Sequence, residues 1–178
     1  HGVSGMGDGP QAAELPNPVA QLGNPDLART VRPVDWYRIV SEGNIERFMP
    51  PFNSLANQER WDAVAYVMTL HTSAEQIETG RQLFEANCAD CSLDNFKDQQ
   101  KMSSLTEVEL ARLVTQGGDG LPAFGSALSE DELWAVAERA KREGSPLGAT
   151  PKVLKDRVEW LADDFDVAIP LDKPRADV

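Results

Sequence analysis

Apolar residues recur at helical spacing in separate segments between residues 35 and 165. The expected buried stripes are, in chain order, Trp36, Ile39 and Val40; Trp61, Val64, Ala65 and Met68; Ile77, Gly80, Leu83 and Phe84; Leu110, Leu113 and Val114; Leu133, Val136, Ala137 and Ala140; and Leu154, Val158, Leu161 and Phe165. Each stripe would cover one face of an amphipathic helix. The pattern therefore predicts an all-α fold.

Residues that favour helix ends bound most of these segments. We expect Asp35 and Asn57 to be N-caps, because their short side chains can accept hydrogen bonds from free helical amides. Three sequence pairs have capping-box spacing: Ser73 with Gln76, Thr106 with Glu109, and Ser129 with Glu132. Glycines at positions 43, 117 and 144 are expected to end helices. Inside a predicted helix, Gly80 lowers helix propensity and so indicates a close helix crossing.

One short motif occurs twice. Residues 47–52 read RFMPPF, and residues 120–124 read GLPAF. Each copy follows an amphipathic segment that ends in glycine and precedes a tryptophan-bearing helix. Such repetition predicts a tandem of two related units. Met49 in the first copy corresponds to Leu121 in the second.

The repeat suggests three parts of the chain. Residues 1–72 form the first expected domain, whose opening 35 residues are rich in Gly and Pro and predict little regular structure. Residues 73–144 form the second domain, with almost no linker between them. Residues 145–178 are expected to contain a linker, a helix and an extended tail.

Composition narrows the classes of partner. The 178-residue chain has a net charge of −12 and a pI near 4.5, which argues against nucleic-acid binding. An acidic surface is compatible with basic protein partners, although solubility is the commoner reason for it. No apolar run approaches the ~20 residues of a membrane-spanning helix. A chain that opens at His1 without Met looks processed or cut.

Three stretches carry a family resemblance. Residues 80–91 read GRQLFEANCADC, residues 1–10 read HGVSGMGDGP, and residues 49–52 read MPPF. Together they resemble class I c-type cytochromes arranged in tandem over about residues 1–144. In that family the C-x-x-C-H motif attaches haem, and a later methionine supplies the second axial ligand. The resemblance implies two small cytochrome c-like helical domains.

The resemblance also assigns roles to single residues. In the first domain it implies His1 and Met49 as axial ligands of the haem iron, with Gly7, Gly9 and Pro10 in the adjoining loop and Pro50 and Phe52 in the methionine turn. In the second domain it implies Cys88 and Cys91 as the haem-attachment pair.

Departures from the family pattern are as informative as the matches. Ser92 stands where the second domain should have its ligand histidine, and Leu121 stands where it should have methionine. Serine is a poor iron ligand and leucine is none. The first domain lacks its helix and C-x-x-C in this sequence, so we expect both to lie upstream of His1. At most one haem c is expected for the chain as given.

Other roles for these residues stay open. Met49 could fill a gap in the core, and His1 could be a processing remnant. Cys88 and Cys91 could be haem remnants, a local disulfide or a redox pair. A thioredoxin-type site is disfavoured because no βαβ pattern surrounds them, and a zinc site is disfavoured because only one C-x-x-C pair is present.

Two hypotheses for function follow. In the first, the protein is a non-enzymatic electron carrier that exchanges electrons with redox partner proteins, some with basic surfaces. In the second, it is a haem-free pseudo-cytochrome that serves as a protein-interaction or sensory module. Attachment of haem c would imply an extracytoplasmic location, because that is where the family matures.

Overall fold

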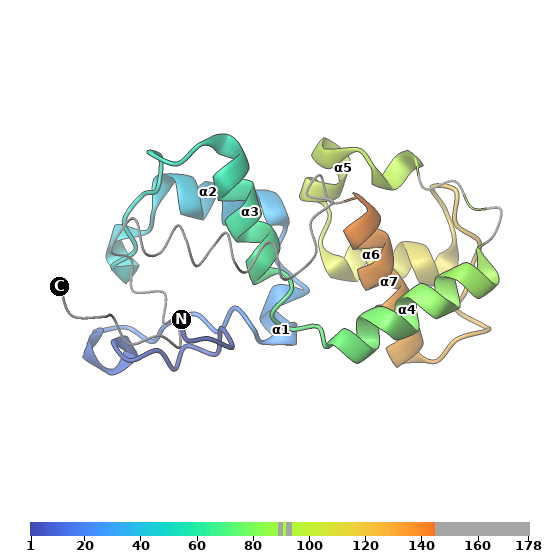
Figure 1. Ribbon diagram of the computed structural model, residues 1–178, viewed down its shortest axis with the longest axis horizontal. Coiled ribbons are helices and arrows are strands. Elements are labelled where there is room, and N and C mark those ends of the chain that lie inside the picture. The colour runs from blue at the N-terminus through green and yellow to red at the C-terminus, as the bar shows by residue number, and fades with distance from the viewer. Residues whose placement is uncertain (89–90, 92–93, 145–178) are drawn as a thin grey trace. The chain divides into compact units, whose positions relative to one another are not determined.

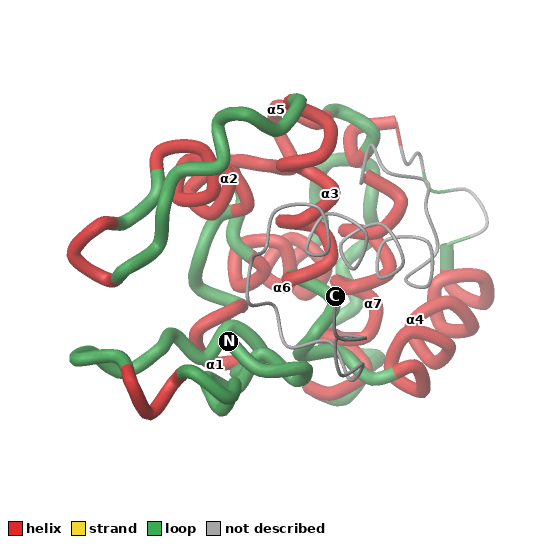
Figure 2. The backbone as a smooth tube through the Cα atoms, turned by 60° about the vertical axis from the view of Figure 1, so that its left-hand side comes forward, coloured by secondary structure: helices red, strands yellow, loops and turns green. Residues whose placement is uncertain are grey.

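The computed structural model describes residues 1–88, 91 and 94–144, and its elements of regular secondary structure are helices (Figure 1). In chain order the elements are η1 (Ala12–Glu14), α1 (Pro25–Ala28), α2 (Pro33–Glu42), η2 (Ile45–Arg47), α3 (Asn57–Val67), α4 (Ala74–Asn87), η3 (Asp94–Phe96), α5 (Gln99–Ser104), α6 (Glu107–Gln116) and α7 (Glu130–Gly144). No strand forms among these described residues (Figure 2). The prediction of an all-α fold is confirmed. The helix and tail expected after residue 145 lie outside the described residues.

The chain divides into two compact units. In the described part, the first unit contains residues 1–27 and 37–71, and the second contains residues 28–36 and 72–144. Residues 28–36 pack with the second unit because Arg29 is anchored there. Its guanidinium lies 4.0 Å from the ring centre of Trp134, and its carbonyl accepts a hydrogen bond from the Val108 amide (3.2 Å).

Local capping fixes the starts of several helices as predicted. The Ser73 hydroxyl accepts a hydrogen bond from the Gln76 amide, and the Gln76 side chain accepts one from the Ser73 amide. Reciprocal bonds of the same kind join Thr106 with Glu109 and Ser129 with Glu132. All three predicted capping boxes are confirmed, because each depends only on residues three positions apart.

Two predicted N-caps are wrong. Helix α2 begins at Pro33, so Asp35 lies inside its first turn, where its carboxylate accepts a hydrogen bond from Arg32 (2.7 Å). Proline suits the first helical position because it has no amide to leave unpaired. Helix α3 begins at Asn57, with Ala56 as its N-cap, and the Glu59 carboxylate accepts from the Ala56 amide (2.7 Å). Both predicted caps therefore lie inside their helices and not before them.

Replacing Thr106 by alanine is expected to destabilise the second unit by about 1 kcal/mol, because the first turn of α6 loses a side-chain acceptor. Hydrogen bonds from the Thr106 amide and hydroxyl lower the pKa of Glu109. The Glu109 carboxylate therefore stabilises the folded state fully above the ordinary glutamate pKa, and this stabilisation is lost as the pH falls through the lowered pKa. Urea unfolding at several pH values measures both effects. Thr106→Ser keeps the acceptor and should match the wild type.

The second unit packs around α7, which contacts both α4 and α6 (Figure 1). Gly80 of α4 makes this possible: a Cβ at that position would lie 2.0 Å from the backbone oxygen of Ala135 in α7. Only a residue without a side chain lets the two backbones approach so closely. The close crossing predicted from Gly80 is confirmed.

The first unit has a smaller buried core. Its buried large apolar side chains among the described residues are Leu55, Val64 and Met68. Trp61, expected in the same stripe, is half-buried and stacks on Tyr37 with ring centres 4.3 Å apart. Most of residues 1–24 is loop (Figure 2). Within the described ranges, no helix has the length and apolar character needed to cross a membrane.

Candidate functional site

The Met49 turn is held by backbone hydrogen bonds. Gly43, with φ +75°, ends α2, and its amide donates to Ile39 O (2.8 Å). The chain then returns through η2, so that Asn44 and Met49 exchange two hydrogen bonds of 2.8 and 3.0 Å. The Phe52 amide donates to Val40 O (2.9 Å), which ties the end of the motif back to the helix. These bonds hold Met49 at a fixed position beside the end of α2.

The Leu121 turn has the same arrangement. Gly117, with φ +81°, ends α6 and donates to Leu113 O (2.8 Å). Gly118 and Leu121 exchange two hydrogen bonds of 3.0 and 2.9 Å, and the Phe124 amide donates to Val114 O (3.0 Å). The hydrogen bonds of Leu121 therefore parallel those of Met49, and those of Phe124 parallel those of Phe52.

His1 opens a glycine-rich loop that folds back on residues 19–23. The imidazole Nδ1 lies 2.9 Å from Ala20 O, and because a carbonyl can only accept, Nδ1 carries the proton of this bond. The Gly7 amide donates to His1 O, and the Gly23 amide donates to Gly5 O (3.0 Å). A Cβ on Gly7 would lie 2.8 Å from Val19 O, so the close approach requires glycine there.

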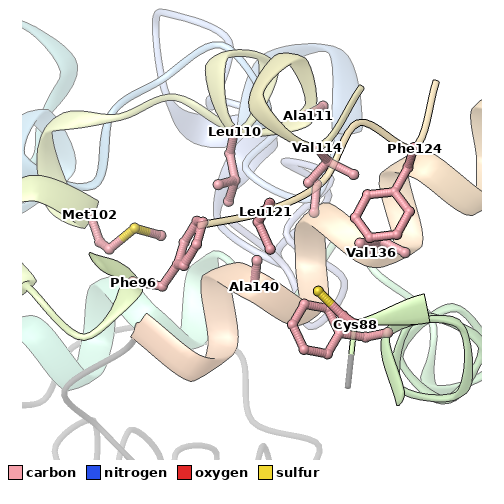
Figure 3. Close-up of a cluster of buried hydrophobic side chains, with 12 residues drawn as sticks. Cys88, Phe96, Met102, Leu110, Ala111, Val114, Leu121, Phe124, Val136 and Ala140 are labelled. Atoms are coloured by element: carbon pink, nitrogen blue, oxygen red, sulfur yellow. The ribbon is translucent and has the colours of Figure 1, made fainter. Parts of the chain in front are cut away.

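Cys88 and Cys91 form a disulfide at the end of α4, with their Cα atoms 5.0 Å apart. Cys88 is buried in an apolar cluster, and Cys91 packs against that cluster. Phe96, Met102 and Leu121 are buried in the same cluster, which α6 and α7 complete with Val114, Val136 and Ala140 (Figure 3). Side chains thus fill the interior next to the C-x-x-C pair. Ser92 lies outside the described residues.

The sequence analysis missed three residues of this cluster, Ala111 and the larger Phe96 and Met102. Phe96 is 1% exposed and Met102 is 8% exposed, and Figure 3 shows Phe96 pointing inward between Met102 and Leu121. Helix α5 is only Gln99–Ser104, too short to carry a recognisable apolar period. A salt bridge of 2.9 Å joins Lys101 of α5 to Asp119 in the Leu121 turn. The sequence offered one signal for their burial: Phe96 and Met102 are the apolar residues in the otherwise polar stretch from 94 to 104.

A buried group of charges lies where α6 begins beside α7. The Lys141 ammonium pairs with Glu107 and with Glu138 (2.9 Å), and the two glutamates are 3% and 5% exposed. Burial alone would lower the pKa of Lys141, but the carboxylates of Glu138 and Glu107 outweigh it and hold the pKa above its ordinary value. Lys141 is therefore charged at neutral pH and compensates the buried carboxylates.

The family model described as cytochrome c oxidase, cbb3-type, subunit III matches residues 75–138. The match supports a c-type cytochrome domain. It covers the core of the second unit, from the start of α4 to the middle of α7. No curated protein and no solved structure matches the chain.

The predicted site residues fall into three groups. In the first unit, Met49 and Phe52 are half-buried in one turn, while Pro50 is exposed. His1 and Pro10 are exposed and Gly7 and Gly9 half-buried, all in the N-terminal loop. In the second unit, Cys88 and Leu121 share one buried cluster. His1 and Met49 are held by separate hydrogen bonds, so their convergence on one iron stays a prediction.

Proposed function

We propose that the first unit binds haem c with His1 and Met49 as axial ligands and carries electrons between partner proteins. The observation that carries the proposal is the bond from His1 Nδ1–H to Ala20 O. In a neutral imidazole with its proton on Nδ1, the lone pair is on Nε2, which is the nitrogen then able to bind iron. Histidines that ligate metals almost always donate their other ring N–H in this way.

The Met49 turn supports the second ligand. A thioether is a weak iron ligand and binds better where the backbone holds it in place, as the paired bonds to Asn44 hold Met49. Large apolar side chains are exposed around this turn: Ile45 is 71% and Phe48 62% exposed. Exposed apolar side chains of this kind are expected on a surface that an apolar macrocycle or a partner protein covers. The family match, although it lies on the second unit, supports an electron-transfer role with haem in general.

When bound, haem iron supplies reversible one-electron transfer, and a methionine ligand raises its reduction potential. The residues of this chain position the group and set its ligands, with no substrate chemistry of their own. An acidic chain favours association with partners that present basic surfaces. Domains of this kind are usually extracytoplasmic, and we propose the same location here.

The test uses the natural gene product, purified from its native source with any residues that precede His1. We expect a sharp α-band on reduction and about one haem per chain. Met49→Ala should lower the reduction potential by part of the ~0.8 V range that axial ligands span and should abolish the methionine–iron charge-transfer band. Spectroelectrochemistry measures both.

The matched control is Met6→Ala, which removes an exposed methionine from the same unit. It should leave the potential and the spectrum unchanged. If the native protein shows no Soret band, or if Met49→Ala behaves like Met6→Ala, the proposed ligation is wrong. A haem-free interaction or sensory module would then be the better description of the first unit.

A further inference from the structure

We infer that the second unit is a haem-free domain in which Cys88 and Cys91 form a structural disulfide in place of haem thioether bonds. The Cα separation of 5.0 Å lies within the range that a disulfide spans. A cysteine sulfur held in a disulfide cannot also form a thioether with haem. The C-x-x-C pair is therefore assigned a disulfide, where its motif suggests thioether bonds to haem.

The packing of the core argues against haem in this unit. Protein interiors have few voids larger than a water molecule, and a porphyrin needs the space of several side chains. Phe96, Met102 and Leu121 are buried in the same cluster as Cys88, with exposed fractions of 1%, 8% and 6% (Figure 3). A macrocycle attached at Cys88 would have to displace them from this cluster.

The ligand chemistry points the same way. The Leu121 turn has the backbone bonds of the Met49 turn, but its side chain is aliphatic and packs in the core. The position after Cys91 is serine rather than histidine. An iron centre here would lack both of the axial ligands that the family uses.

The position of the cysteines favours a structural disulfide over a reactive one. Cys88 is the C-cap of α4, at the negative end of the helix dipole. Activated C-x-x-C thiols lie instead at helix N-termini or beside cations. Burial of Cys88 in an apolar cluster also limits the access of an attacking thiol to its sulfur. Once formed, the bond is therefore a poor substrate for thiol exchange.

Formation of the Cys88–Cys91 bond needs an oxidant. The oxidant in this proposal is the disulfide of another protein in an oxidising compartment. The thiolate of Cys91, the less buried cysteine, attacks the oxidant and forms a mixed disulfide, which releases one thiol. Cys88 then attacks the Cys91 sulfur and releases the second. Two cysteine thiols lose two electrons and two protons, and the oxidant's disulfide becomes two thiols.

Peptide mapping of the natural full-length protein tests the inference. The protein is alkylated without a reductant, digested and analysed by mass spectrometry. We expect the peptide with Cys88 and Cys91 to be unalkylated, two hydrogens lighter than the dithiol, and free of haem. Haem on this peptide, or alkylation of both thiols, would overturn the inference. Haem on any other peptide bears on the first unit alone.

A double substitution provides the second readout. Cys88→Ser/Cys91→Ser should leave the haem content per chain and the reduction potential unchanged, because neither depends on the second unit. The unfolded fraction of the second unit should rise about tenfold, since a cross-link that restricts the unfolded chain is lost. Chemical reduction of the wild type should produce the same rise. Loss of haem in the double variant would contradict the assignment.

Discussion

Replacing Lys141 by methionine is expected to lower the free energy of unfolding of the second unit by about 3–5 kcal/mol. Lys141 supplies the positive charge that pairs with Glu107 and Glu138, and all three groups are largely removed from water. Methionine has a similar length but leaves two carboxylates buried without that cation. Urea unfolding of the full chain, with amide hydrogen exchange of α6 and α7 to localise the change, measures the loss.

The control tests whether lost charge pairing is the cause. Glu107→Gln/Glu138→Gln in the Lys141→Met background removes the buried charges and should recover most of the stability, because neutral replacements of buried ion groups are often tolerated. In the wild type, the raised pKa of Lys141 means that its contribution persists at neutral pH and is lost only as the pH rises through that raised value. A Lys141→Met variant as stable as the wild type would contradict this account.

Gly80→Ala is expected to destabilise the second unit by about 2–3 kcal/mol. In an isolated helix the change would stabilise by about 1 kcal/mol, because alanine is the better helix former. Here the new Cβ would lie 2.0 Å from Ala135 O and 2.6 Å from the attached carbonyl carbon. A backbone carbonyl cannot rotate away as a side chain can, so α4 and α7 must separate. Urea unfolding followed by far-UV circular dichroism measures the net change.

Gln82→Ala is the matched control for Gly80→Ala. Gln82 lies on the same helix, is exposed and contacts Glu78 within α4. Its replacement should change stability by no more than about 0.5 kcal/mol. A Gly80→Ala variant as stable as this control would mean that the two helices do not cross as closely as described.

Much of the helical framework could be predicted because its causes are local. The capping boxes that begin α4, α6 and α7 join residues three positions apart, so the sequence contains everything they need. The failures at Asp35 and Asn57 are also local. Pro33 competes for the helix start in one case, and Glu59 supplies the capping acceptor in the other.

The candidate site was predictable only as a set of residues. The resemblance to c-type cytochromes named His1 and Met49 as the expected ligands, but a motif cannot say which carbonyl His1 contacts. Ala20 lies in a loop that the glycines at positions 5 and 7 bring close. The contact between His1 and Ala20 depends on how the N-terminal loop folds. This loop has almost no helical pattern, so the sequence contains no periodic signal from which the contact could be predicted.

By itself, the amino-acid sequence determined most of the helices, most of their caps, the repeated turn, and the serine and leucine at positions 92 and 121. These depend on residue identity and on neighbours a few positions away. Only the tertiary structure decided the disulfide between Cys88 and Cys91 and the burial of Phe96 and Met102 in the core. Burial is a property of segments far apart in the chain, and the period of a six-residue helix cannot reveal it.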